Sequence, residues 1–305
     1  MYKAHDSFET PPQGASLWKY FDFTKFVSLL EKKALFFSKA ANFPDHFEGS
    51  YPTGNLELVS EEHRPQVQAH ARSFGQNLFV NCWHMNDFES EAMWKVYSAW
   101  DRGIAIRTTV GNLATSLTCE ADVYIGAVNY VDFSTERIDE GNVFLPHLTK
   151  RTSFEYEREV RAVTLNAVPD DTEWLGKSAE WIQTGIYYSV DTNALIGEVF
   201  ISPESEDWFV DLVRAVVSRY GVDARVKRSG LADAPPWWVE QSERFPGLLD
   251  ELSKVLGEDY QLTTSSGASV SFQHQEQGLH VKYGDYESYV RLNYGVPTPE
   301  TESEP

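Results

Sequence analysis

Short apolar segments, separated by polar and Pro- or Gly-containing stretches, are the feature that most limits how this chain can fold. Such segments are typical of β-strands, whereas apolar residues spaced three and four apart are typical of helices. Helices are expected at 24–33, 89–100 and 207–221. Strands are expected at 17–21, 34–38, 77–85, 102–110, 123–133, 159–165, 186–191, 196–203 and 223–229. The mixture predicts an α+β fold rather than a doubly wound sheet.

The chain is expected to divide at the Pro pair of the stretch LADAPPWWVE. With 305 residues and 42% hydrophobic content, it can bury a full core. The pattern predicts a flexible lead-in (1–16), a main α+β domain (17–231), a small C-terminal α+β appendage (237–296) and a disordered acidic tail (297–305). Within the appendage, a helix is expected at 247–257, followed by two or three antiparallel strands around Gly278 and Gly284.

Charge and cysteine content limit the class of protein. The formal net charge of −20 opposes sequence-independent binding to nucleic acids, whose affinity comes from Lys and Arg on phosphates. The two cysteines, Cys82 and Cys119, form no CxxC motif, so neither a disulfide framework nor a thiolate zinc site is expected. The N-terminus has no apolar signal region, and no run approaches the roughly 18 apolar residues of a membrane helix. We expect a cytoplasmic protein that binds no membrane.

Familiar catalytic signatures do not occur in the sequence. It contains no GxGxxG, GxxxxGK[ST], HExxH or GxSxG motif, which removes the usual forms of Rossmann dehydrogenases, P-loop enzymes, zincins and α/β-hydrolases. The histidines are scattered, and we expect no metal site.

Charged residues gather at the entrance to the strand expected at 159–165. Side chains alternate along a strand, so Glu157 and Glu159 are expected to point to the same face, with Arg161 continuing it. Two adjacent carboxylates repel, so either one pKa is raised or both are held ionised by Arg158, Arg161 or Lys150. The cluster is therefore an ionic lattice, a functional site, or both.

Four stretches resemble a bacterial family catalogued as domain of unknown function 2971. They read LWKYFDF…ALFFSKAANFPDHFEG, AMWKVYSAWDRGIAIRTT, KRTSFEYEREVRAV and LIGEVFISPESEDWFVDLVRAVVSRYGVDARVKRSGL, and together span roughly residues 17–231. The loop from Asn42 to Glu48 is an expanded version of the family's compact motif. The family's name records no activity, so the resemblance implies a fold more than a function.

A second similarity supplies a chemical hypothesis. Tyr20, Ser38 and the pair Glu157-x-Glu159 occur in the order that ADP-ribosyltransferase-like toxins and anti-phage effectors use. This resemblance implies a split antiparallel sheet flanked by helices and NAD as the substrate. Glu159 would stabilise the oxocarbenium-like species formed when the nicotinamide–ribose bond breaks, and Glu157 would orient or deprotonate the acceptor.

The same hypothesis assigns NAD-binding roles. Tyr20 or Tyr97 would stack on nicotinamide, and Lys19 or Arg161 would pair with the pyrophosphate. Ser38 would hydrogen-bond Glu159. The full predicted NAD-binding set is Lys19, Tyr20, Ser38, Asn42, Trp94, Tyr97 and Arg161. The acceptor is an unidentified protein or nucleic acid, and the appendage is a candidate surface for a partner protein.

Two other interpretations stay open. In the first, the protein is a non-enzymatic module that binds a ligand or a partner, its Glu and Arg residues form a structural network, and its aromatic residues belong to the core. The second is a metal-dependent nuclease using Glu157, Glu159 and Asp45 or Glu48, for which no ligand spacing provides support.

Overall fold

The computed structural model describes residues 1–98, 102–165 and 184–233, together with four strands between 260 and 291. The chain forms two units, Met1–Asp233 and Ala234–Pro305, which are described separately. The described helices include none with the length and apolar character needed to cross a membrane.

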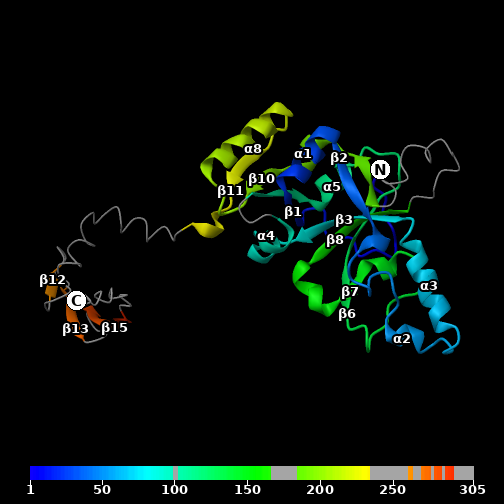
Figure 1. The fold of residues 1–305 in the computed structure, drawn as a ribbon, viewed down its shortest axis with the longest axis horizontal. Helices are drawn as coiled ribbons and strands as arrows, with labels where there is room; N and C mark the ends of the chain where they lie inside the picture. The colour runs from blue at the N-terminus through cyan, green and yellow to red at the C-terminus, as the bar shows by residue number, and fades with distance from the viewer. Residues whose placement is uncertain are drawn as a thin grey trace, which may run out of the picture. The chain divides into compact units, whose positions relative to one another are not determined.

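Figure 1 shows the elements of the first unit. Its strands are β1 (Ser16–Asp22), β2 (Ala34–Lys39), β3 (Leu78–Met85), β4 (Gly103–Thr109), β5 (Tyr124–Ala127), β6 (Asn129–Val131), β7 (Thr149–Arg151), β8 (Glu159–Leu165), β9 (Gly185–Ser189), β10 (Glu198–Ile201) and β11 (Arg225–Arg228). Its α-helices are α1 (Phe23–Lys32), α2 (Thr53–Leu56), α3 (Arg64–Phe74), α4 (Glu91–Tyr97), α5 (Val110–Ser116), α7 (Thr192–Leu195) and α8 (Asp207–Arg219). Short 3₁₀ turns are η1 (Ala40–Asn42), η2 (Leu145–Leu148), η3 (Thr152–Glu157) and η5 (Gly230–Ala232).

The described strands form a large, mostly antiparallel sheet, which confirms the α+β prediction. The order along the sheet is β11-β10-β4-β1-β3-β2-β9, and β8 pairs with both β3 and β5. The β10–β11 pair is parallel, and the other pairs of this sheet are antiparallel. A small parallel pair, β6 with β7, lies beside it.

The sheet splits along one edge of β3. Because β8 pairs with β3 along its length, β1 and β2 must share the opposite edge. β1 pairs with β3 at Trp18↔His84, whereas β2 pairs at Ser38↔Val80. Residues 81–83 of β3 therefore pair with neither strand in the described register, and β1 and β2 diverge there. The predicted split antiparallel sheet is present.

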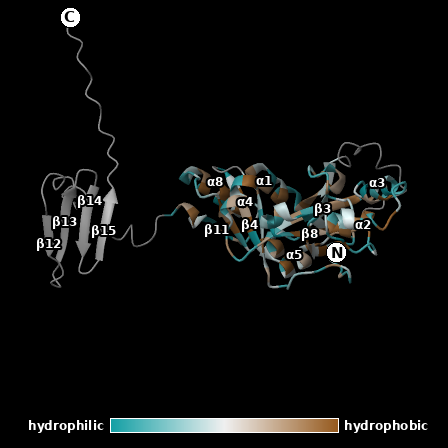
Figure 2. Ribbon diagram, turned by 90° about the horizontal axis from the view of Figure 1, so that it is seen from below, coloured by the Kyte–Doolittle hydropathy of each residue, from teal (hydrophilic) through white to brown (hydrophobic). Residues whose placement is uncertain are grey.

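Apolar side chains cover the sheet where helices pack on it. Helix α1 buries Phe26, Leu29 and Leu30, and α8 buries a second apolar face that includes Phe209 and Val213. Helix α3 is mainly polar and buries only Ala71 (Figure 2). This difference follows the amphipathic spacing in the sequence.

Three local features differ from the sequence predictions. The strand expected at 123–133 is interrupted at Val128, whose N–H donates to the Glu159 carbonyl, so that β5 and β6 pair with different partners. Helix α5 follows β4 and was not predicted; Thr109 caps it by accepting from the Asn112 N–H. The lead-in expected at 1–16 contacts the rest of the first unit, because Tyr2 bridges Val123 and Phe8 is buried.

The second unit contains a four-stranded antiparallel sheet in its described part. Its strands are β12 (Tyr260–Thr263), β13 (Ser269–Gln275), β14 (Gly278–Tyr283) and β15 (Tyr286–Arg291), in that order. Two or three antiparallel strands were expected around Gly278 and Gly284. The helix expected near 247–257 and the acidic tail lie outside the described residues.

Candidate functional site

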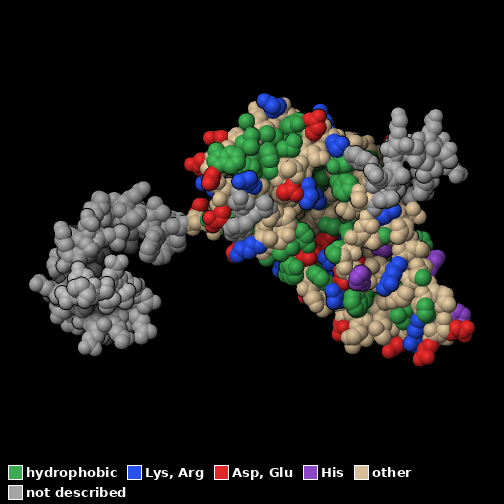
Figure 3. Space-filling model, viewed as in Figure 1, with side chains coloured by type: hydrophobic (Ala, Val, Ile, Leu, Met, Phe, Trp, Pro, Cys, Tyr) green, Lys and Arg blue, Asp and Glu red, His purple; other side chains and the backbone are tan. Residues whose placement is uncertain are grey.

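A cavity of about 670 Å³ opens beside the split in the sheet. Its walls come from β1, β3, α4, the loop 43–48 and the segment 150–161. Charged side chains lie within a hollow on the face seen in Figure 3, and apolar side chains lie beside them. Three of the four stretches that resemble the known family thus meet at one place: the first supplies Lys19 and Glu48, the second Tyr97, and the third Glu157.

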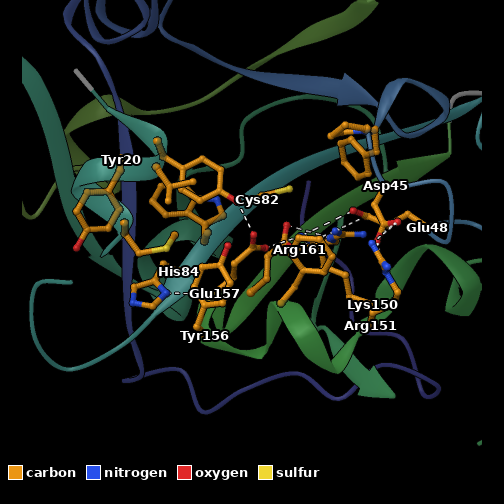
Figure 4. Close-up of a pocket in the computed structure, with 18 of the residues that line it drawn as sticks. Tyr20, Asp45, Glu48, Cys82, His84, Lys150, Arg151, Tyr156, Glu157 and Arg161 are labelled. Carbon is orange, nitrogen blue, oxygen red and sulfur yellow. Dashed lines mark hydrogen bonds and ion pairs between the residues drawn. The ribbon is translucent and has the colours of Figure 1, made fainter. Parts of the chain in front are cut away.

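Five buried charges form the floor of this cavity (Figure 4). Lys150 contacts Glu157 closely and lies 3.4 Å from Glu159 and 3.7 Å from Glu48. Arg161 makes two hydrogen bonds to Glu159, of 3.0 and 2.9 Å, and pairs with Glu48 at 2.5 Å. The carboxylates and cations alternate in the order Glu48, Arg161, Glu159, Lys150, Glu157. We call these five residues the charge network.

Opposite charges favour the ionised forms of Glu159 and Lys150. Burial by itself would raise the pKa of Glu159, but Arg161 and Lys150 outweigh it and lower the pKa to about 2. Burial raises the pKa of Glu48 despite the same two cations. Burial disfavours the Lys150 ammonium, yet Glu159 and Glu157 raise its pKa overall. With all five groups ionised, three carboxylates face two cations, which gives the network itself one excess negative charge. Lys19 lies outside the network and interacts electrostatically with Glu159.

The backbone places Glu157 differently from the prediction. It ends η3 rather than lying on the strand, and β8 begins at Glu159. Between them Arg158 adopts a left-handed conformation, with φ of 41°. That turn directs both carboxylates to Lys150 and sends the Arg158 guanidinium outward, 3.4 Å from the Asn86 side-chain oxygen. Of the three cations expected to hold the pair, Lys150 and Arg161 do so and Arg158 does not.

Glu157 is the network member in contact with α4. The hydroxyl of Tyr97 donates to its carboxylate at 2.7 Å, and the His84 ring hydrogen-bonds its backbone carbonyl at 2.6 Å. Burial and this carboxylate raise the pKa of Tyr97, so the phenol stays protonated. Tyr97 is 43% exposed, which leaves part of its ring open at the cavity.

Lys19 reaches into the split of the sheet. It follows the last β1–β3 pair, and its Nζ donates to the Cys82 carbonyl at 2.9 Å, on the stretch of β3 left unpaired by β1 and β2. The ammonium also lies 5.3 Å from the centre of the Trp83 ring. Within the described ranges no carboxylate is at ion-pair distance from it. Burial lowers its pKa to about 8.

Tyr20 lines the cavity but is held in the core. It is 7% exposed, its hydroxyl accepts from the Ser90 N–H at 3.0 Å, and its ring packs edge-on against Trp94 at 5.0 Å. Trp94 is fully buried and does not line the cavity; its indole N–H donates to Glu89. Both rings belong to a cluster around Trp18, as the core interpretation expects.

Three further predicted roles differ from the observed contacts. Ser38 lies on β2, paired with Val80 and Gly185, away from the residues that line the cavity, and its predicted hydrogen bond to Glu159 is not among the contacts described for that carboxylate. Asn42 ends η1 and is not among the residues that line the cavity, although the next residue, Phe43, is. Arg161 does line the cavity, but it is 1% exposed and engaged with the charge network, so its guanidinium is not placed for a pyrophosphate.

Two site features were not among the predicted binding residues. Lys150 joins Glu157 to Glu159, and Arg151 pairs with Asp45 at 3.1 Å at the cavity wall. The Arg151–Asp45 pair joins residues that lie far apart in the sequence, so no local spacing predicts it, whereas Lys150 is one of the cations expected to hold Glu157 and Glu159. Among the described residues, no group of three or more His, Cys, Asp or Glu side chains is arranged to hold a metal ion.

Comparison with known proteins adds one distant likeness. No protein-family model matches the chain, and no curated protein is similar to it at a significant level. Among solved structures, Thermus sp. 2.9 DarT in complex with carba-NAD+ is similar at 7% sequence identity and a TM-score of 0.31, over 72% of this chain and 96% of that one. A likeness this distant carries no argument about activity, and membership of the family suggested by the sequence stays a prediction.

Proposed function

We propose that the protein is an ADP-ribosyltransferase-like enzyme that binds NAD in the cavity and cleaves its nicotinamide–ribose bond. The observation that carries the proposal is the excess negative charge of the network at the floor of an aromatic-walled cavity, beside the split in the sheet. A fixed, ionised carboxylate in a desolvated site stabilises a developing oxocarbenium charge without reorganisation.

The two predicted carboxylates have different surroundings, which supports separate roles. Glu159 is held ionised by Arg161 and Lys150, and this suits electrostatic stabilisation of the ribosyl cation. Glu157 touches Tyr97 and Lys150 and has no guanidinium partner among the described contacts, which suits orienting or deprotonating the acceptor. Water as the acceptor would make the enzyme an NAD glycohydrolase.

Other lining residues suit the rest of the substrate. Tyr97, with part of its ring exposed, is a better platform for nicotinamide than the core residue Tyr20. Lys19 and Arg151 are the cavity cations outside the network, so we assign the pyrophosphate to them in place of Arg161. Ser38, Asn42 and Trp94 take no direct part.

A second candidate function is a non-enzymatic module that binds a ligand in the same cavity. The observation that favours it is the complete pairing of the three carboxylates, since each has a cation within 4 Å. In this case the network serves stability alone, and the ligand is chosen by the cavity walls.

Proton NMR of the full chain with NAD distinguishes the two candidates. The enzyme proposal expects release of nicotinamide by the wild type and its loss in Glu159→Gln, with the far-UV circular dichroism unchanged. Glu155→Gln is the matched control, because Glu155 is an exposed carboxylate on the same η3 segment. Equal nicotinamide release by wild type and Glu159→Gln would refute the proposed role of Glu159. A raised melting temperature with NAD but no release would favour the binding module.

A further inference from the structure

Lys19 is unlike the other cations that line the cavity. Lys150, Arg151 and Arg161 each pair with a carboxylate, whereas the Lys19 ammonium donates to a backbone carbonyl and lies over an indole ring. This amine sits at the edge of an apolar surface, next to a cavity large enough for a small aromatic molecule. Amines in such surroundings lose the proton that keeps them unreactive.

We propose that Lys19 is a reactive amine that forms an imine with aromatic aldehydes bound in the cavity. The geometry gives both requirements: a nucleophile beside open volume, and aromatic walls formed by Trp83, Tyr97, Phe154 and Tyr156. The proposal goes beyond NAD cleavage and applies to the cavity without NAD, because Lys19 would pair with the pyrophosphate as an ammonium but reacts with an aldehyde as a neutral amine. No step uses NAD, Glu157 or Glu159 as a reactant.

The chemical step is balanced by water. The lone pair of the neutral Lys19 amine adds to the aldehyde carbon to give a carbinolamine. Loss of the former carbonyl oxygen as water, which carries away the two amine protons, leaves a carbon–nitrogen double bond. Neither partner is oxidised or reduced.

The lowered pKa of Lys19 favours this step near neutral pH. Burial lowers the value to about 8, with the Cys82 thiol and Glu159 acting to raise it and Lys25 acting to lower it. An ordinary lysine has a pKa of about 10.4, so at pH 7.5 the neutral fraction of Lys19 is larger by a factor of about 200. Restricted access to the buried amine reduces this advantage, and we expect imine formation at Lys19 to be at least about tenfold faster than at an exposed lysine.

The test is reductive trapping on the full chain, followed by peptide mass spectrometry. The protein is incubated at pH 7.5 with pyridine-3-carbaldehyde and sodium cyanoborohydride, which reduces imines to stable amines. Labelling is timed at Lys19 and at Lys25, whose side chain is 72% exposed. The expected result is labelling of Lys19 at least about tenfold faster; equal or faster labelling of Lys25 would overturn the proposal.

Two controls separate reactivity from folding and define the ligand class. Lys19→Arg keeps a donor for the Cys82 carbonyl but removes the nucleophile, so the fast label should vanish while the melting temperature changes little. Lys25→Arg should leave the fast label intact. Formaldehyde does not need aromatic walls for binding. Its ratio of Lys19 to Lys25 labelling rates should therefore be several-fold smaller than the ratio for pyridine-3-carbaldehyde. Equal ratios for the two aldehydes would overturn the aromatic assignment.

Discussion

Replacing Lys150 by Met removes the one ammonium that all three network carboxylates share. Lys150 contacts Glu48, Glu157 and Glu159, and its side chain is 8% exposed. In Lys150→Met, only Arg161 remains to neutralise three buried carboxylates, and Glu157 keeps only its hydrogen bond from Tyr97 among the described side-chain contacts. Leaving a buried charge uncompensated costs about 3–5 kcal/mol, so the free energy of unfolding should fall by that amount.

Glu157→Gln is the informative comparison. It removes a charge from the same ion pair, but it makes the net charge of the network less negative, whereas Lys150→Met makes that charge more negative. The network then holds two carboxylates and two cations, and the amide oxygen can still accept from Lys150 while the amide NH2 donates to the Tyr97 hydroxyl oxygen. The expected cost is about 1 kcal/mol, the size of one weakened hydrogen bond. An account based on the number of salt bridges would instead predict that loss of the close Lys150–Glu157 contact in Glu157→Gln costs more than loss of the longer contacts of Lys150 with Glu159 or Glu48.

Urea denaturation at pH 7, followed by tryptophan fluorescence, measures both costs. Equal slopes of unfolding free energy against urea would show that the variants change stability rather than the unfolded state. The double variant Lys150→Met/Glu157→Gln should recover about 1–3 kcal/mol relative to the sum of the single changes. A loss below about 1 kcal/mol in Lys150→Met, or a loss in Glu157→Gln as large as in Lys150→Met, would refute the charge-balance reasoning.

Three further predictions concern single groups of the site. The pKa of Glu159 is lowered from 4.5 to about 2, so its ionisation stabilises the fold fully above pH 4.5, and about 3 kcal/mol is lost as the pH falls toward 2; urea titrations between pH 6 and pH 2.5 should give a shallower dependence for Glu159→Gln than for wild type. Tyr97→Phe removes a hydrogen bond to a carboxylate and should lower the unfolding free energy by about 1–2 kcal/mol, whereas an unchanged urea midpoint would contradict that contact. Lys19→Met leaves the Cys82 carbonyl without its donor and should cost about 1–2 kcal/mol, more than Lys19→Arg; differential scanning calorimetry of the pair tests this order.

The sequence was most informative where hydrophobic periodicity decides the structure. The strands β1, β3 and β8 and the helices α1 and α8 match predicted segments, because buried faces impose their spacing on the residues. Boundaries were less predictable. The β5–β6 break at Val128 depends on a hydrogen bond to Glu159, which is distant in sequence, and periodicity carries no record of such a partner.

The types of residue at the site could be predicted from the sequence, but their contacts with one another could not. Glu157 and Glu159 were identified from an E-x-E pattern, yet they meet because Arg158 takes a left-handed turn, not because they alternate on a strand. Glu48 reaches Arg161 across 113 positions of sequence, so no spacing rule could pair them. Trp94, chosen as a ligand contact, has the helical spacing of a core residue and is one.

The same carboxylates could belong to a structural ionic lattice or to a catalytic site. The net charge of the network distinguishes these two cases. A purely structural lattice is most stable when its charges cancel, so the third carboxylate is a cost to the fold unless a positive charge outside the network, on Lys19 or on a bound cation, offsets it. Glu159→Gln cancels the excess charge of the network. The ion pairs Lys150–Glu157 and Arg161–Glu48 remain in this variant. Under either account this variant at pH 7 should lose the roughly 3 kcal/mol of stability that the lowered pKa of Glu159 provides. If the excess serves a transient cation, the wild type should release nicotinamide and the variant should not. If the network serves the fold alone, the stability loss should be the dominant effect and the wild type should release no nicotinamide.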